Sequence, residues 1–195
     1  MNHFPLTLTE YLDGIARETV RMSYPGRMGG IVKTKTKRDV LQPYFTTRFP
    51  LKKVWKNADH IAERFDKWHG KRVREMGGVL KKQVKKDYHA EAVAAKFLNT
   101  FLYQLMKYEQ CRPLWNQLHL PLDNRVFKAL KSLDSPTLEP IKEILGRSAY
   151  SLSLKEYGKV QMTLWKLIEE LNERPVIGYQ LKSRIELNVL WAKGR

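Results

Sequence analysis

Apolar residues recur at intervals of three and four positions along most of the chain, and alternating, strand-like stretches are nearly absent. This spacing is typical of amphipathic helices and predicts an all-α protein of about eight to ten helices. The chain has 195 residues, close to the size of one ordinary domain. We therefore expect a single domain over residues 1–195, whose helices form two lobes around a central cleft.

The N-terminal part of the chain predicts two helices separated by a loop. Thr9 can cap the first helix, which runs to about Arg21. Residues 24–30 are rich in glycine and predict a loop. Pro50 opens the second helix, whose apolar stripe continues without a break to Trp68.

The middle of the chain combines basic segments with the most apolar helix. Residues 32–38 alternate lysine and threonine, which predicts either an extended arm that touches phosphates or a mobile loop. Residues 71–88 place basic side chains on both sides of Gly77 and Gly78, which predicts two short basic elements rather than one helix. Residues 90–108 are apolar over a wide arc and predict a buried central helix.

The C-terminal part carries clear helix-start signals. Asp123 stands where an N-cap would begin a helix, and Ser135-Pro136 starts a short helical segment. Residues 153–156 form a capping box that opens a long helix to about Asn172. Residues 184–191 predict a last helix.

Net charge points to the kind of partner. The chain has 36 Lys and Arg against 20 Asp and Glu, a net charge of +16, and most of the excess lies in residues 1–100. A polyanion is the expected partner, and nucleic acid is the leading candidate. A solubilising surface, or a patch that faces the ribosome or a membrane, would explain the charge as well.

Other features narrow the chemistry and the compartment. A single cysteine, Cys111, cannot form an internal disulfide, and the five histidines never recur at the spacing of a helical metal site. We therefore expect no metal and no other cofactor. No apolar run is long enough to span a membrane, and the N-terminus lacks the pattern of a signal peptide. These features predict a protein of the cytoplasm, associated with the nucleoid, that needs no obligate protein partner.

One stripe of the predicted central helix carries candidate chemistry. Lys96, Thr100, Tyr103 and Lys107 follow one another at steps of four, three and four residues. An amine at position 96 would lose hydration among apolar neighbours and become a nucleophile. Alternatively, Lys96 extends to solvent or pairs with a carboxylate such as that of Glu91.

Three segments, in this order, resemble the helix-hairpin-helix DNA glycosylases, and most closely their archaeal 8-oxoguanine branch. Residues 96–102 open a buried helix with a lysine, and residues 120–126 read apolar-Pro-apolar-Asp-x-Arg-Val. Residues 161–171, Pro175 and residues 185–191 are similar to the closing part of that branch, which ends in Leu-Trp. The resemblance covers about residues 90–195 and implies a two-lobed helical bundle with a basic cleft.

The resemblance also implies roles for individual residues. Lys96 would attack the anomeric carbon, with Lys107 as the rival lysine. Asp123 would stabilise positive charge on the sugar or activate water. Without the resemblance, an aspartate at position 123 is better explained as an ordinary helix cap. The substrate-binding residues that follow are Trp191, Thr100, Trp165, Arg125, Lys82, Lys85 and Lys86.

Three departures from the family pattern bear on the substrate. The glycine-rich hairpin before the lysine is missing, so the nearby lysines, 81 and 82 with 85 and 86, would grip phosphates instead. Leu187 stands where the archaeal enzymes have a base-reading aspartate, and Thr100 stands where they have an aromatic residue. These changes argue against ordinary 8-oxoguanine recognition.

The resulting expectation is a DNA N-glycosylase, with or without strand-cleaving lyase activity, that flips out and excises a modified base. A bulky base of phage DNA, such as glucosylated hydroxymethylcytosine, fits an antiviral role, and an oxidised base fits repair. Two alternatives remain. One is a non-enzymatic helical module that binds DNA or RNA, and the other is a base-modifying transferase, although no phosphate-cradling glycine motif is present for a co-substrate.

Overall fold

The computed structural model describes residues 7–23, 30–33, 36–173 and 180–188. These residues are helical almost throughout and contain no strand, so the predicted all-α class is confirmed. The only sheet-like pairing among them is an isolated antiparallel bridge between Val32 and Val84.

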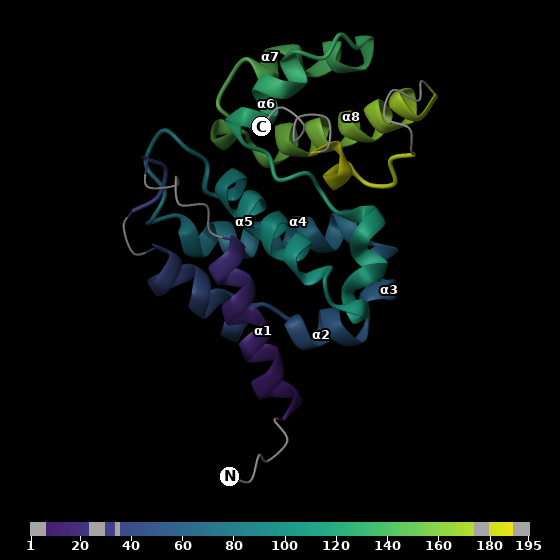
Figure 1. Ribbon diagram of the computed structural model, residues 1–195. Helices are drawn as coiled ribbons and strands as arrows, with labels where there is room; N and C mark the ends of the chain where they lie inside the picture. The colour runs from purple at the N-terminus through teal and green to yellow at the C-terminus, as the bar shows by residue number, and fades with distance from the viewer. Residues whose placement is uncertain (1–6, 24–29, 34–35, 174–179, 189–195) are drawn as a thin grey trace.

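Two groups of elements lie on either side of a central helix pair (Figure 1). The pair consists of α4 (Phe65–Leu80) and α5 (Ala90–Leu105). One group contains α1 (Leu8–Ser23), the π-helical turns η2 (Lys37–Leu41) and η3 (Tyr44–Arg48), α2 (Leu51–Lys56), α3 (Ala58–Ala62) and the 3₁₀ segment η4 (Glu109–Gln117). The other contains α6 (Asn124–Lys131), η5 (Pro136–Ile141), α7 (Lys142–Leu145), η6 (Ala149–Ser151), α8 (Leu154–Glu173) and η7 (Arg184–Asn188).

Helix α5 is the central helix that its composition predicts. It is buried on most of its circumference, and even Lys96 and Asn99 are buried within it. The aromatic rings of Phe45 and Phe101 stack with centroids 3.9 Å apart and fix α5 against the first group. The helix ends at Leu105, three residues earlier than the sequence pattern predicts.

Of the predicted helix caps, the one at Ser153 is confirmed and the one at Thr9 is wrong. Ser153 and Glu156 form the expected capping box, with reciprocal hydrogen bonds between each side chain and the other residue's backbone amide. The first helix is capped by Thr7 and not by Thr9, because Thr7 exchanges the same pair of bonds with Glu10. The prediction for Thr9 was therefore wrong by two residues.

The predicted continuous helix from Pro50 to Trp68 is interrupted twice. Asn57 and Arg64 leave the helical conformation, with φ and ψ of −137° and 36° and of −128° and 31°. Neither residue is a proline or a glycine, so no local signal marks the breaks. The apolar stripe nevertheless faces the core, through Leu51, Val54, Ala58, Ile61 and Phe65.

The predicted break at Gly77-Gly78 does not occur, because α4 runs through both glycines to Leu80. A Cβ atom added to Gly77 would lie 3.1 Å from Cγ of Glu91 on α5, whereas one added to Gly78 would meet nothing within 4 Å. Gly77 therefore serves the close packing of α4 on α5 rather than a turn.

Several further segments depart from the expected elements. The predicted arm at 32–38 is not extended over its whole length, because η2 begins at Lys37. The last predicted helix is a 3₁₀ segment as far as Asn188, and its remainder, including Trp191, lies outside the described residues. Most of the predicted loop at 24–30 also lies outside them.

Candidate active site

Lys96 and Asp123 meet, as the sequence motifs predict. Nζ of Lys96 lies 2.8 Å from Oδ2 of Asp123, and the two side chains are 10% and 26% exposed. Lys96 lies in the second turn of α5, and Asp123 is the residue immediately before α6. The pair is therefore a partly buried ion pair between the central helix and the second group of elements.

Asp123 is also the N-cap of α6. Its Oδ1 accepts hydrogen bonds from the backbone amides of Arg125 and Val126, each 2.9 Å long, which leaves Oδ2 for Lys96. Burial pushes the pKa of Asp123 upward, but the hydrogen bond and charge of Lys96, with the two amides, outweigh it and hold the pKa below its ordinary value. The carboxylate is thus ionised at neutral pH.

Tyr150 is a third member of the site that sequence reasoning missed. Its hydroxyl lies 2.9 Å from Nζ of Lys96, and its side chain is buried. Burial is the larger effect on its pKa and raises it, although the charge of Lys96 acts in the opposite direction. No sequence spacing links position 150 to position 96, so only the folded chain reveals this contact.

Contacts with distant parts of the sequence hold Tyr150 in place. Asn124 accepts a hydrogen bond at Oδ1 from the amide of Ala149, 2.9 Å long, and thereby ties η6 to the start of α6. The amide of His89 donates to the carbonyl oxygen of Tyr150 at 2.8 Å. Tyr88 packs edge-on against the Tyr150 ring, with centroids 6.1 Å apart. The residues before α5 and the residues after α6 therefore converge on Lys96.

The predicted phosphate-gripping lysines lie in the connection that leads to this point. Lys81, Lys82, Lys85 and Lys86, which we call the basic turn, are all exposed. The backbone of the turn is pinned by hydrogen bonds from Lys33 N to Gln83 O and from Lys85 N to Ile31 O, of 2.9 and 3.0 Å. The turn is thus a fixed, positively charged feature, three residues away from the His89–Tyr150 bond.

Behind Asp123, a buried polar network fixes the segment that carries it. Gln161 on α8 bonds both the amide and the carbonyl group of Leu120. The His119 ring lies 2.9 Å from the hydroxyl of Tyr157 through Nδ1 and 2.7 Å from Oδ1 of Asp66 through Nε2. Asn99 on α5 donates to the Tyr157 hydroxyl at 2.7 Å. The network therefore joins α4, α5 and α8 to His119 and Leu120, which lie four and three residues before Asp123.

Three other residues predicted for the site contribute no side chain to the Lys96–Asp123 pair. Lys107 lies beyond the end of α5, with Nζ 5.0 Å from the ring centroid of Tyr108, so Lys96 is the lysine that meets Asp123. The hydroxyl of Thr100 donates to the carbonyl oxygen of Lys96 within the helix. Arg125 is exposed on the first turn of α6 and offers its backbone amide to Asp123.

The predicted base-stacking tryptophans have different outcomes. Trp165 packs against the guanidinium group of Arg184, whose Cζ lies 4.9 Å from the ring centroid, so this face of the ring is already covered. Trp191 lies outside the described residues. Leu187 is fully buried, whereas the neighbouring Glu186 accepts a hydrogen bond from the indole of Trp115 at 2.6 Å.

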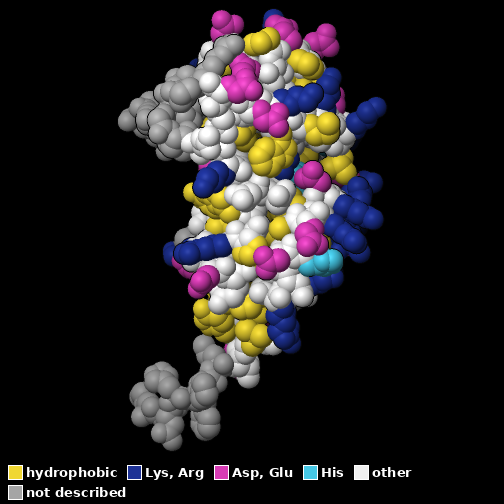
Figure 2. Space-filling model, turned by 90° about the vertical axis from the view of Figure 1, so that its right-hand side faces the viewer, with side chains coloured by type: hydrophobic (Ala, Val, Ile, Leu, Met, Phe, Trp, Pro, Cys, Tyr) yellow, Lys and Arg dark blue, Asp and Glu magenta, His cyan; other side chains and the backbone are white. Residues whose placement is uncertain are grey.

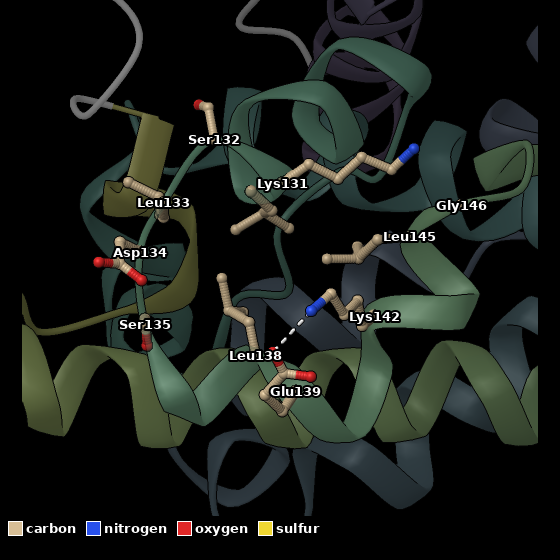
Figure 3. Close-up of a pocket in the computed structure, with 11 residues that line it drawn as sticks. Lys131, Ser132, Leu133, Asp134, Ser135, Leu138, Glu139, Lys142, Leu145 and Gly146 are labelled. Atoms are coloured by element: carbon tan, nitrogen blue, oxygen red, sulfur yellow. Dashed lines mark hydrogen bonds and ion pairs between the residues drawn. The ribbon is translucent and has the colours of Figure 1, made fainter.

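A cavity of about 600 Å³ opens at the far end of α6 (Figure 3). Leu130, Leu133, Leu138 and Leu145 form its apolar lining, and the ion pair of Lys142 with Glu139 stands at its side. Neither Lys96 nor Asp123 lines it, and the eight residues of α6 separate it from Asp123 by roughly 12 Å. This cavity is therefore not a base pocket for the Lys96–Asp123 pair.

Two other kinds of site are missing from the described part of the chain. It contains no group of three or more His, Cys, Asp or Glu side chains placed to hold a metal ion. None of its helices combines the length and the apolar character that crossing a membrane requires.

No protein-family model matches the chain, and no curated protein or solved structure is significantly similar to it. A functional proposal must therefore rest on the geometry around Lys96 and on the sequence motifs.

Proposed function

We propose that the protein is a DNA glycosylase of the two-lobed helix-hairpin-helix type, acting in the cytoplasm at the nucleoid. The observation that carries the proposal is the 2.8 Å contact between Nζ of Lys96 and Oδ2 of Asp123. The amine and the carboxylate lie 27 residues apart in the sequence, in two motifs that resemble those of glycosylases. The proposed chemistry requires these two groups to be in contact. The exposed basic turn, which ends three residues before the His89–Tyr150 bond, supports DNA as the substrate.

In the proposed reaction, Asp123 stabilises the positive charge that develops on the sugar as the glycosidic bond breaks. The base leaves with the bonding electron pair and takes up a proton. When water is the nucleophile, its oxygen bonds to the anomeric carbon and its proton passes to the Asp123 carboxylate. Ionisation of Asp123 at neutral pH, which the lowered pKa ensures, is required for both tasks.

A lysine route uses the same pair. Lys96 passes a proton to Asp123, and its free amine bonds to the anomeric carbon as the base departs. Opening of the sugar ring then gives an iminium ion on Nζ, which borohydride reduces to a stable adduct. Elimination of the 3′ phosphate from this intermediate would cleave the strand.

The proposed base is bulky and modified, as in phage DNA that carries glucosylated hydroxymethylcytosine, and the proposed role is antiviral defence. Two observations favour it over 8-oxoguanine. Leu187 is fully buried and offers no polar group to a base, and Thr100 uses its hydroxyl within α5. Neither position can therefore supply the aspartate or aromatic contact of the archaeal enzymes.

The second candidate is a non-enzymatic helical protein that binds DNA or RNA. One specific observation favours it. Asp123 already caps α6 with one oxygen and pairs with Lys96 through the other, which is a complete structural use of the side chain. This candidate predicts binding without release of any base.

The deciding experiment incubates the protein with DNA panels that contain oxidised, deaminated or glucosylated bases and detects free base by mass spectrometry. Borohydride trapping tests for the lysine adduct. Lys96→Ala is expected to abolish trapping, and its matched control Lys107→Ala, on the same chain segment, is expected to keep it. Absence of free base from every panel would favour the binding protein.

A further inference from the structure

Helix α4 presents a row of cations on the face that points away from the core. Lys67, Lys71 and Arg74 follow at steps of four and three residues and are all exposed. The opposite face of the helix is buried through Phe65, His69, Val73, Met76 and Leu80. At 100° per residue, the three cations lie within about 60° of one another and opposite the centre of this buried face.

The acidic residues near this row are already engaged elsewhere. Asp66 contacts His119 and Arg184. Glu75 pairs with Arg72 at 2.7 Å. Within the described residues, no carboxylate lies at ion-pair distance from the three cations of the row. Their charges are therefore presented to solvent without local compensation.

A comparison with α8 shows that this is not a general property of the exposed helices. Lys155, Lys159 and Lys166 lie on one face of α8, within about 40° of one another. Glu169 and Glu173, also exposed, continue the same face. The α8 row therefore carries two carboxylates on its own face, whereas the nearest carboxylate of α4, Glu75, lies beside the α4 row and pairs with Arg72.

The α4 row continues into the basic turn. Gly78 stands on the same face and leaves open space, and Lys81 and Lys82 follow at the end of the helix. From Lys67 to Lys82 the positive track extends about 22 Å at the rise of a helix. Lys and Arg side chains also gather along one edge of the face drawn in Figure 2. Duplex DNA carries one negative charge per about 1.7 Å of its axis, so a track of this length faces several phosphates.

We propose that Lys67, Lys71 and Arg74 form a docking surface for the phosphate backbone of duplex DNA, which we call the α4 ridge. The ridge extends the contact surface beyond the basic turn and binds without regard to sequence, because it offers only point charges and one guanidinium group. The inference shares the DNA partner of the proposed function but none of its chemistry.

The test measures binding of an unmodified 30-base-pair duplex at several salt concentrations. Each phosphate contact contributes a slope of about −0.9 to the logarithm of the association constant against the logarithm of salt concentration. The variant Lys67→Ala/Lys71→Ala/Arg74→Ala is expected to make this slope less negative by about 2 to 3. The matched control Lys155→Ala/Lys159→Ala/Lys166→Ala removes the same charge from one face of α8 and is expected to leave the slope unchanged. Circular dichroism and urea midpoints show that both variants are folded.

Three results would overturn the inference: an unchanged slope in the ridge variant, an equal change in both variants, or failure of the wild-type protein to bind the duplex. If the ridge variant keeps its DNA slope, loss of its binding to phosphatidylserine vesicles would assign the ridge to anionic lipid instead. The duplex contains no substrate base, so the ridge and the glycosylase proposal fail separately. A slope change without any base release leaves the ridge in place and removes the chemistry.

Discussion

The hydroxyl of Tyr150 lies 2.9 Å from Nζ of Lys96, although 54 residues separate the two in the sequence. Lys96 is thereby held from two sides, by the carboxylate of Asp123 and by a phenol. A nucleophile that is misplaced by about 1 Å can lose a hundredfold in rate, so this second restraint bears on the lysine route.

Tyr150→Phe is expected to slow formation of the borohydride-trapped adduct by about tenfold and to lower the free energy of unfolding by about 1 to 2 kcal/mol, because a buried hydrogen bond to a charged group is lost. Tyr88→Phe is the control, since it removes a neighbouring phenol hydroxyl and keeps the ring that packs against Tyr150. Trapping rates and urea unfolding measure the two effects. Equal rates in wild type and Tyr150→Phe would show that the phenol does not position the amine.

The two adjacent glycines of α4 are expected to respond differently to alanine. Gly78→Ala gains helix propensity in open space and should raise the free energy of unfolding by about 0.5 to 1 kcal/mol. Gly77→Ala gains the same propensity but places its Cβ 3.1 Å from Cγ of Glu91, so its net effect should be less favourable. Urea denaturation of the two variants measures the difference, and a larger gain at Gly77 would contradict the close packing of α4 on α5.

Acid is expected to weaken the fold through His119. Burial lowers the pKa of His119 to about 4, against an ordinary value of 6.5, and the hydrogen bond to Asp66 offsets only part of this effect. Below pH 6.5, His119 is therefore protonated in the unfolded chain but stays neutral in the folded protein until the pH approaches 4. The free energy of unfolding consequently falls as the pH drops. The pKa of His69 is also lowered by burial and acts in the same direction.

Between pH 7 and pH 4, the expected loss from His119 is on the order of 3 kcal/mol in the free energy of unfolding, followed by urea denaturation at each pH. Asp66, whose pKa its hydrogen bond with His119 lowers to about 2, adds a further loss between about pH 4 and pH 2. His60→Gln is the control, because the side chain of His60 is 65% exposed and lies outside the buried network of His119. A flat profile from pH 7 to pH 4 would contradict the buried, neutral state of His119.

Local signals in the sequence predicted two helix starts that depend on local bonds and missed a third, the box that Thr7 forms with Glu10 at the start of α1. The capping box at Ser153 and the cap at Asp123 were predicted because each uses neighbours within three residues. The breaks at Asn57 and Arg64 were not predicted, since neither position is a proline or a glycine. Gly77 led to the prediction of a helix break that does not occur, because the absence of a side chain there allows close packing against α5.

The candidate site shows the same division. The contact between Lys96 and Asp123 was predicted from the resemblance of two motifs to those of the glycosylases. Spacing alone did not predict it, because spacing was also consistent with ordinary structural roles for both residues. Tyr150 could not be predicted, because its place depends on the bonds of η6 to Asn124 and His89. Trp165 was expected at the base, but the cation of Arg184 covers one face of its ring.

The central claim is that the Asp123 carboxylate takes part in base release, and Asp123→Asn tests it most directly. Asparagine caps helices about as well as aspartate, so α6 and the affinity for DNA should be kept. The rate of free-base release, followed by mass spectrometry at saturating protein, is expected to fall by about 100- to 1000-fold. Release at the wild-type rate by a folded Asp123→Asn protein would contradict the claim and leave Asp123 as a helix cap alone.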